Sequence, residues 1–138
     1  MEEACFVDTS AWYAYSVPED THHAPAQAFL RDASRRLITT NYVMLETANL
    51  LHLRSGRGRA VEFLRQFRES RRLTTHHVTP GEHDDAERLF NESGGYSLTD
   101  CSSFVVMRSI GLRDCFTFDR DFARAGFSVV PEAPARTS

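Results

Sequence analysis

Acidic residues follow two apolar stretches of the chain, at positions where they could do chemistry. Asp8 comes directly after Ala4–Val7, and Asp119 comes directly after the stretch 115–118. We predict both stretches to be buried strands, because they are short and rich in β-forming residues. In an open parallel sheet, ligands bind in the crevice outside the carboxyl ends of the strands. If the two strands are neighbours, about 4.8 Å apart, the carboxylates can share one cation or a pair, and Asp121 could join them.

Two further carboxylates lie on predicted helices. Glu46 is in the middle of a predicted helix over 41–53, which is so apolar that we expect little of it to face water. A charge in such a place needs a partner. Asp100 is in the first turn of a predicted helix over 98–110, where the backbone amides and the helix dipole favour an anion.

Each of these acids also has an interpretation without chemistry. Asp8 can cap the turn that follows it. Asp100, three residues after Ser97, fits a variant of the capping box in which Glu is the usual partner. Glu46 can reach solvent along its own stem, although Glu is seldom fully buried without a partner. The four acids are explained better together, as one binding site, than separately.

The segments around these acids carry a family resemblance. In chain order they are Val7-Asp8-Thr9-Ser10-Ala11, Glu46 followed by Ala48-Asn49-Leu50-Leu51, Leu98-Thr99-Asp100, and Thr117-Phe118-Asp119-Arg120-Asp121-Phe122. Together they resemble the PIN-domain ribonucleases, and most closely the VapC-type toxins, over nearly the whole chain. The resemblance implies an endoribonuclease that is the toxin of a type II toxin–antitoxin pair. It also implies a catalytic divalent-metal site made of Asp8, Glu46, Asp100 and Asp119.

Hydrolysis of RNA would require such a group of acids. The reaction needs an activated water in line with a leaving 3′ oxygen, and carboxylate-held Mg²⁺ or Mn²⁺ ions about 3.5 to 4 Å apart can stabilise both oxygens. Oxygen-only ligands select these hard cations, so we expect Mg²⁺ or Mn²⁺ as cofactor, with Asp121 as a further candidate ligand. Without metal the acids repel one another, and some should hold a proton. Ser10 or Thr117 could hydrogen-bond a ligand acid, or be ordinary capping and strand-end hydroxyls.

The basic residues are unusual in type. All sixteen are arginine, and the chain has no lysine. This excludes a standard P-loop, a protein kinase and a pyridoxal or Schiff-base enzyme, each of which needs a lysine. It also argues against a haloacid-dehalogenase-like phosphatase and a response-regulator receiver, which place acids at strand ends but use a lysine as well.

Seven of the arginines lie in the segment 54–72, which has a local charge of +5 in a chain of net charge −3. Such a segment could guide RNA phosphates toward the acids, and its candidate RNA-binding residues are Arg54, Arg57 and Arg59. One alternative is a solvated helix whose arginines pair with its own glutamates. Another is a surface for an antitoxin. The segment 54–80 has no motif that matches the family, so the resemblance does not predict the RNA target.

Histidines and aromatic residues receive plainer interpretations. The six histidines show no H-E-x-x-H or Cys/His ligand spacing, and we interpret them as loop and surface residues. Trp12, Tyr13 and Tyr15 are interpreted as helix packing rather than as base stacking. The three cysteines have no C-x-x-C spacing, which argues against a zinc knuckle or a disulfide framework.

The elements that position the acids follow from hydrophobic periodicity and turn residues. Strand patterns recur between helical patterns, so we expect an α/β fold: a three-layer α/β/α sandwich with a mainly parallel central sheet. One domain over 1–131 and a flexible tail over 132–138 are predicted. Strands are predicted at 4–7, 37–40, 73–78, 115–118 and 127–130. Helices are predicted for a short segment capped by Thr9 or Ser10, for 20–35, for 41–53 capped by Asn41, for 58–71, 82–91 and 98–110, and for a turn at 119–125.

The setting and the partners complete the hypothesis. The chain has no apolar run of about 18 residues that could span a membrane, and its start does not resemble a secretory signal. We therefore expect a cytoplasmic protein. The family resemblance implies an RNA substrate and an antitoxin partner, and we also expect a homodimer. The rival hypothesis is a non-catalytic RNA- or protein-binding module on the same scaffold.

Overall fold

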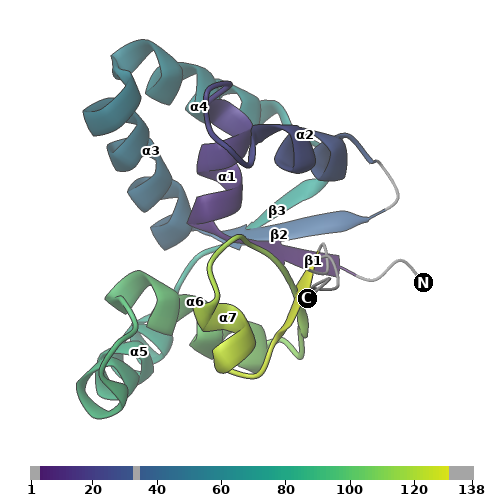
Figure 1. Cartoon of the computed structure of the whole chain (residues 1–138). Coiled ribbons are helices and arrows are strands. Elements are labelled where there is room, and N and C mark those ends of the chain that lie inside the picture. Colours follow the sequence, from purple (N-terminus) through teal and green to yellow (C-terminus); the bar gives the residue numbers. More distant parts are fainter. Residues whose placement is uncertain (1–3, 33–34, 131–138) are drawn as a thin grey trace, which may run out of the picture.

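The computed structural model describes residues 4–32 and 35–130, which are built around one five-stranded sheet (Figure 1). The strands are β1 (Ala4–Val7), β2 (Arg36–Thr40), β3 (Leu73–His76), β4 (Asp114–Phe116) and β5 (Ser128–Val130). The helices are α1 (Thr9–Ser16), α2 (His23–Arg31), α3 (Asn41–Ser55), α4 (Arg57–Glu69), α5 (Pro80–Ser93), α6 (Leu98–Ser109) and α7 (Asp121–Arg124).

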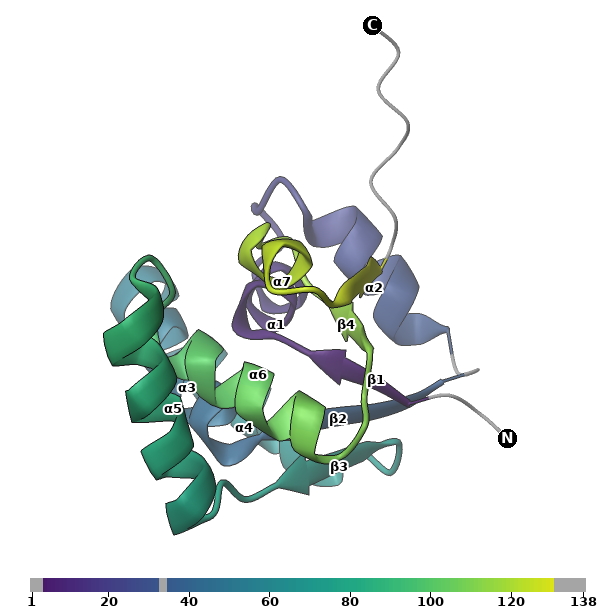
Figure 2. The ribbon, with the colours of Figure 1, turned by 90° about the horizontal axis from the view of Figure 1, so that it is seen from below.

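Helices cover both faces of the sheet. In Figure 1, α1 to α4 lie above it and α5 to α7 lie below it. The view from below in Figure 2 shows α5 and α6 side by side on the lower face, where they pack against each other. The predicted three-layer α/β/α sandwich is therefore confirmed.

All strand pairs are parallel, and the strand order is β3-β2-β1-β4-β5. The chain thus adds strands outward from β1, first on one side and then on the other. The first and fourth strands are neighbours, with the pairs Phe6–Cys115 and Val7–Phe116, which is the condition under which Asp8 and Asp119 were expected to share a cation. Because the direction of winding reverses between β1 and β4, their carboxyl ends frame the crevice where such sheets bind ligands.

Apolar strands and aromatic side chains form the core beside this crevice. Phe6 and Phe116 on the strands are fully buried, as expected for strands covered on both faces, and so are Phe104 of α6 and Phe122 of α7. The rings of Phe104 and Phe122 meet edge to face, with their centroids 4.9 Å apart. This packing ties α6 and α7 together on the lower face of the sheet.

The predicted helix over 20–35 is shorter than expected. It begins at His23, because the Asp20 Oδ1 atom accepts a hydrogen bond from the backbone N–H of His22 at 2.8 Å and turns the chain before the helix. Its last helical residue is Arg31, and residues 33–34 of the prediction lie outside the described residues.

The predicted helix over 82–91 begins earlier, at Pro80. Thr79 caps it: the Thr79 hydroxyl accepts from the N–H of Glu82 at 3.1 Å, and the Glu82 carboxylate accepts from the N–H of Thr79 at 2.9 Å. This is a capping box with proline at the first helical position. The predicted start at residue 82 therefore leaves out the first turn of the helix.

Thr40, and not Asn41, caps α3. The Thr40 hydroxyl accepts from the N–H of Val43 at 3.1 Å, while Asn41 Oδ1 accepts from the N–H of Val78 at 2.8 Å. The ends of the other predicted strands and long helices differ from the structure by at most two residues. Residue 131 of the predicted domain and the predicted tail over 132–138 lie outside the described residues. Within the described ranges, none of the helices is both long and apolar enough to cross a bilayer.

Candidate metal centre at the sheet edge

An open cleft of about 770 Å³ lies at the carboxyl ends of β1 and β4. Its walls come from the start of α1, the connection between α1 and α2, one side of α3, the start of α6 and the segment after β4. All five acids singled out from the sequence line it, namely Asp8, Glu46, Asp100, Asp119 and Asp121.

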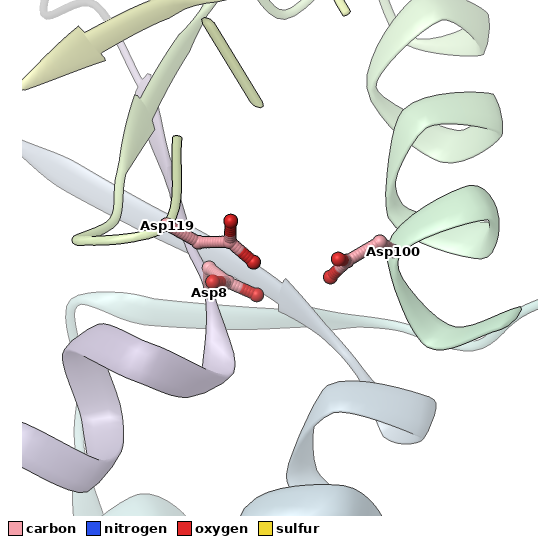
Figure 3. A group of neighbouring side chains, drawn as sticks. All are labelled: Asp8, Asp100 and Asp119. Atoms are coloured by element: carbon pink, nitrogen blue, oxygen red, sulfur yellow. The ribbon is translucent and has the colours of Figure 1, made fainter. Parts of the chain in front are cut away.

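Three of these acids form a tight group. Asp8, Asp100 and Asp119 each offer one carboxylate oxygen, and these three oxygens lie within 4.8 Å of one another. Figure 3 shows Asp8 and Asp119 extending from neighbouring strand ends, with Asp100 facing them from the first turn of α6. Ser97 caps that helix, because its hydroxyl accepts from the backbone N–H of Asp100 at 3.0 Å. The cap therefore uses the backbone of Asp100 and leaves its carboxylate in the acidic group.

Hydroxyl groups fix the Asp8 carboxylate from one side. Its Oδ2 atom lies 2.9 Å from the Thr117 hydroxyl and 3.1 Å from the Ser10 hydroxyl, both placed to donate, and 3.4 Å from the donating N–H of Ser10. Asp8 thus caps α1, as its capping interpretation predicts, whereas Thr9 and Ser10, the other predicted caps, are the first two helical residues. Its Oδ1 atom is buried and has no hydrogen-bond partner within the described part of the chain. A buried carboxylate oxygen left open in this way fits coordination of a cation.

The segment after β4 is held by the same hydroxyls. The N–H of Phe118 donates to Ser10 Oγ at 3.0 Å, and the N–H of Asp119 donates to Thr117 Oγ1 at 2.9 Å. The N–H of Asp121 in turn donates to Asp119 Oδ1 at 2.9 Å. The positions of Asp8 and Asp119 are therefore coupled through one hydrogen-bonded network.

Two of the three close aspartates have raised pKa values. Burial raises the pKa of Asp8 to about 6, although hydrogen bonds from Thr117 and Ser10 act against it. Burial, followed by the charges of the other acids in the cleft, raises the pKa of Asp100 to about 8. Without a cation, Asp100 thus keeps a proton at neutral pH. Because all the donors are carboxylate oxygens, the group suits a hard divalent cation.

Comparison with known proteins identifies the scaffold. Residues 5–128 match the PIN domain. The chain belongs to the PIN domain family. It is 35% identical over 130 residues to the 23S rRNA-specific endonuclease VapC20 of Mycobacterium tuberculosis (strain CDC 1551 / Oshkosh), a match that covers 92% of this chain and 98% of VapC20.

Solved structures agree with this PIN-domain assignment. The crystal structure of Mycobacterium tuberculosis VapC20, a sarcin–ricin loop cleaving toxin, matches with a TM-score of 0.84 and 34% identity, over 89% of this chain and 95% of that one. DNA-bound VapBC from Salmonella typhimurium matches with a TM-score of 0.65 at 14% identity, over 94% and 97% of the two chains. The second likeness concerns the fold alone.

Glu46 and Asp121 lie in the cleft of this PIN domain but outside the group of three close oxygens. Glu46 is half-buried on α3, and its charge contributes to the raised pKa of Asp100. The Asp121 carboxylate pairs with Arg124 at 3.5 Å. The expectation that little of α3 faces water is wrong, because Leu45 is 61% exposed.

The three candidate RNA-binding arginines occupy different places. Arg54 lines the cleft, and its guanidinium lies 5.9 Å from the centroid of the Tyr13 ring. Arg59 lies outside the cleft lining and makes a two-pronged ion pair with Glu19, at 2.8 and 2.9 Å, which lowers the pKa of Glu19 to about 2. Arg57 is exposed at the first position of α4.

Other arginines of the segment 54–72 have structural partners. Arg65 pairs with Glu62 and Glu69 on the exposed face of α4, as the solvated-helix interpretation predicts. Arg72 donates to the backbone carbonyl oxygens of Leu30, Asp32 and Arg35, at 2.9, 2.7 and 3.2 Å. Arg65 and Arg72 thus stabilise the folded chain through intramolecular contacts.

Four residues of the cleft lining were not predicted from the sequence to belong to the site. Tyr13, Asp20, His22 and Phe118 border the cleft together with the acids. Tyr13 had been interpreted as helix packing and His22 as an ordinary surface residue. No sequence pattern identifies these residues as part of the site. Only the fold brings His22 into contact with Phe118 in the segment after β4.

Proposed function

We propose that this protein is a divalent-metal-dependent endoribonuclease, the toxin of a toxin–antitoxin pair, and that it cuts 23S rRNA. The observation that carries the proposal is the group of three aspartates whose oxygens lie within 4.8 Å of one another. One of them, Asp8, has a buried oxygen with no hydrogen-bond partner among the described residues. The activity and the RNA are inferred from VapC20, the 23S rRNA-specific endonuclease that matches most of this chain.

Asp8, Asp100 and Asp119 would hold Mg²⁺ or Mn²⁺, and Glu46 is the fourth proposed ligand from across the cleft. Asp121 pairs with Arg124 and is not one of these four proposed ligands. A bound divalent cation supplies Lewis-acid stabilisation of the charge on the reacting phosphodiester oxygens. Its hard character suits these oxygen ligands.

The chain's own side chains have separate tasks in this proposal. The Ser10 and Thr117 hydroxyls orient the Asp8 carboxylate through its Oδ2 atom, which leaves Oδ1 for the cation. The Asp100 carboxyl group loses its proton when a cation enters, since the positive charge offsets repulsion by the other acids. Arg54, on the wall of the cleft, receives a phosphate of the RNA backbone.

Cleavage by purified protein tests the proposal. Ribosomal RNA is incubated with the wild type or the Asp8→Asn variant, in Mg²⁺, Mn²⁺ or EDTA, and new RNA 5′ ends are mapped. The wild type should produce discrete new ends only with a divalent cation, and Asp8→Asn should produce none. RNA binding without cleavage under every condition would instead support the non-catalytic binding module.

An antitoxin partner is proposed on the same grounds, since VapBC complexes share this fold. Expression of the wild type alone should arrest growth of a bacterial host, and co-expression of the cognate antitoxin should restore it. This proposal places the protein in the cytoplasm, where both ribosomal RNA and the antitoxin are found. Growth arrest by Asp8→Asn as strong as that by the wild type would contradict a toxin that acts by cleaving RNA.

A homodimer is proposed from an exposed apolar stripe on α3. Leu45 and Leu53, two turns apart, are 61% and 79% exposed, and Leu98 of α6 extends the surface. The stripe borders the catalytic cleft, so a second copy would pack beside the site. Mass measurement by light scattering should show a dimer that Leu45→Glu with Leu53→Glu dissociates, whereas Val61→Glu, at another exposed apolar position, should leave it intact.

A further inference from the structure

An aromatic pair stands at the rim of the cleft, outside the group of acids. The imidazole of His22 stacks on the ring of Phe118, with centroids 4.4 Å apart and the planes 7° from parallel. Both residues line the cleft, and Phe118 directly precedes Asp119. His22 is exposed, whereas Phe118 is half-buried. The stack therefore places an accessible flat ring beside the acidic group.

The backbone at both rings is fixed before any ligand arrives. The N–H of His22 donates to Asp20 Oδ1 at 2.8 Å, and its carbonyl oxygen accepts from the N–H of Ala26 at 3.0 Å. The N–H of Phe118 donates to Ser10 Oγ at 3.0 Å. Ordering on binding thus costs little, which is the benefit of a preorganised site.

The fold itself makes little use of the imidazole. His22 occupies the N-cap position of α2, yet its side chain makes no capping hydrogen bond. Its neighbour His23 differs, because the His23 ring hydrogen-bonds the carbonyl oxygen of Ala14 at 2.9 Å and ties α2 to α1. Stacking on Phe118 occupies one face of the His22 ring, and the exposed side chain remains open to a ligand in the cleft.

We propose that His22, supported by Phe118, is the platform on which a nucleobase next to the cleaved phosphodiester stacks. This inference rests on the proposed nuclease function and names a residue that positions its substrate. Proteins read unpaired RNA by stacking its bases on aromatic and histidine rings. The acids would hold the cation that binds the phosphate. Phe118 directly precedes Asp119, so the His22 ring stacked on it lies beside the path of the adjacent base.

A binding cycle between protein and RNA tests the platform. The probe is a hairpin of the 23S rRNA sarcin–ricin loop, together with variants in which one loop nucleotide at a time is abasic. Binding is measured in the Asp8→Asn background with Mg²⁺, because this variant should not cleave the hairpin. His22→Ala should weaken binding of the intact hairpin about tenfold, the loss expected for one stacked base. His22→Phe should bind within about twofold of the parent, because it keeps a flat ring.

Coupling at a single nucleotide is the decisive result. At one loop position, removal of the base should weaken hairpin binding by the parent about tenfold. The same removal should leave hairpin binding by the His22→Ala variant almost unchanged. His77→Ala, at an exposed histidine outside the cleft lining, should behave as the parent at every position. Equal base dependence of His22→Ala and the parent at all positions would overturn the platform, as would a His22→Phe variant as weak as His22→Ala.

Failure of the nuclease proposal would be visible separately. Wild-type protein that binds the hairpin but leaves it intact in Mg²⁺ and Mn²⁺ would contradict the catalytic assignment, while the binding cycle would still report on stacking. In cleaving protein, His22→Ala should raise KM about tenfold and leave kcat within about twofold. A loss confined to kcat would contradict a role in binding the base.

Discussion

Asp8 combines two roles in one side chain. Its Oδ2 atom caps α1 and receives the Ser10 and Thr117 hydroxyls, while its Oδ1 atom is buried without a partner in the described part of the chain. The capping interpretation and the ligand interpretation of this residue are therefore compatible. A carboxylate has two oxygens, and the fold uses them for different purposes.

Thr117 should matter more for activity than for stability. Thr117→Val removes the hydroxyl that holds Asp8 Oδ2 and accepts from the N–H of Asp119, so the two acids lose a shared anchor. We expect cleavage to fall about tenfold or more, with a loss of about 1 kcal/mol in the free energy of unfolding. Steady-state cleavage and urea denaturation measure the two effects.

Thr9 provides the matched control for this change. Its hydroxyl is also buried but has no hydrogen-bond partner within the described residues, so Thr9→Val should leave stability unchanged or slightly higher. Equal losses of activity in the two variants would show that shape at the cleft matters, and not the hydroxyl network.

Asp100 should be needed for cleavage but not for folding. Asp100→Asn removes a carboxyl group whose ionisation is opposed by burial and by the neighbouring acids, so the metal-free protein should be as stable as the wild type or more stable at pH 8. Cleavage should fall at least about a hundredfold, because a proposed metal ligand is lost. Thermal unfolding in EDTA and a cleavage assay in Mn²⁺ measure the pair of effects.

Ser97 separates capping from chemistry in the same turn of α6. Ser97→Ala removes the acceptor for the N–H of Asp100 and should cost about 1 kcal/mol of stability. The carboxylate stays, so cleavage measured well below the thermal midpoint should remain within a few-fold of the wild type. A large loss of metal-free stability in Asp100→Asn would show that its carboxylate supports the helix.

At the scale of elements, the sequence predicts what local patterns determine. The short apolar runs that precede Asp8 and Asp119 were enough to predict two strands. That these strands are neighbours comes from the structure. The start of α5 was predicted two residues late, although Thr79 and Glu82 form its capping box and Pro80 is its first residue. The cleft wall at His22 depends on contacts between segments far apart in sequence, which periodicity does not encode.

The helix α3 has two adjacent rows of side chains, one that lines the cleft and one that is exposed. Glu46, Leu50 and Arg54 follow one another at intervals of four residues and all line the cleft. Leu45 and Leu53 lie on the adjacent exposed stripe. One helix therefore carries an acid and a cation into the cleft and exposes an apolar surface beside it.

Arg54 should bind RNA without specifying its sequence. Arg54→Gln should raise the dissociation constant several-fold for unrelated RNAs alike and reduce the slope of log K against log salt by about 1, since one phosphate contact is lost. Filter binding at several salt concentrations measures both effects. The rate of cleavage of bound RNA should change little, because phosphate contacts position the substrate.

Arg59 and Arg57 serve as controls for Arg54. Arg59 is engaged by Glu19 outside the cleft lining, and Arg57 is exposed at the start of α4, so neither change to Gln should match the effect of Arg54→Gln. RNA affinity that falls for Arg57→Gln and Arg59→Gln but not for Arg54→Gln would place the RNA on α4. Loss of antitoxin binding alone in those two variants would assign α4 to the protein partner.

At the scale of the molecule, the fold brings acids from distant parts of the chain close together, so that their negative charges repel one another. Asp8, Asp100 and Asp119 come from the ends of β1 and β4 and from α6, and the cleft holds them within 4.8 Å. Their mutual repulsion opposes folding whenever they are ionised without a cation. The stability of the whole fold should therefore depend on both pH and metal.

The direction of the pH dependence follows from the raised pKa values. Asp8, with a pKa of about 6, and Asp100, with a pKa of about 8, both start from an ordinary value of 3.8 in the unfolded chain. The folded state thus binds more protons than the unfolded state between about pH 4 and pH 8. The stability contributed by these groups is complete below about pH 4 and is lost as pH rises through 6 and then 8.

Metal-free protein should therefore become less stable between pH 5 and pH 8, by an amount on the order of a few kcal/mol. Urea denaturation in EDTA at unit steps of pH measures this loss. In Asp100→Asn, the free energy of unfolding should change little between pH 6 and pH 8. Asp85→Asn, at an exposed acid paired with Arg88 on α5, should show the same pH dependence as the wild type.

Saturating Mn²⁺ should oppose the same loss and stabilise the wild type more at pH 8 than at pH 5, because cation and protons compete for the same oxygens. At a concentration a hundred times the dissociation constant, the gain is about 2.7 kcal/mol for one site. Asp100→Asn should lose most of it. A metal-free stability that rises from pH 6 to pH 8, or an equal gain from Mn²⁺ in the wild type and Asp100→Asn, would mean that the three aspartates do not form one cation site.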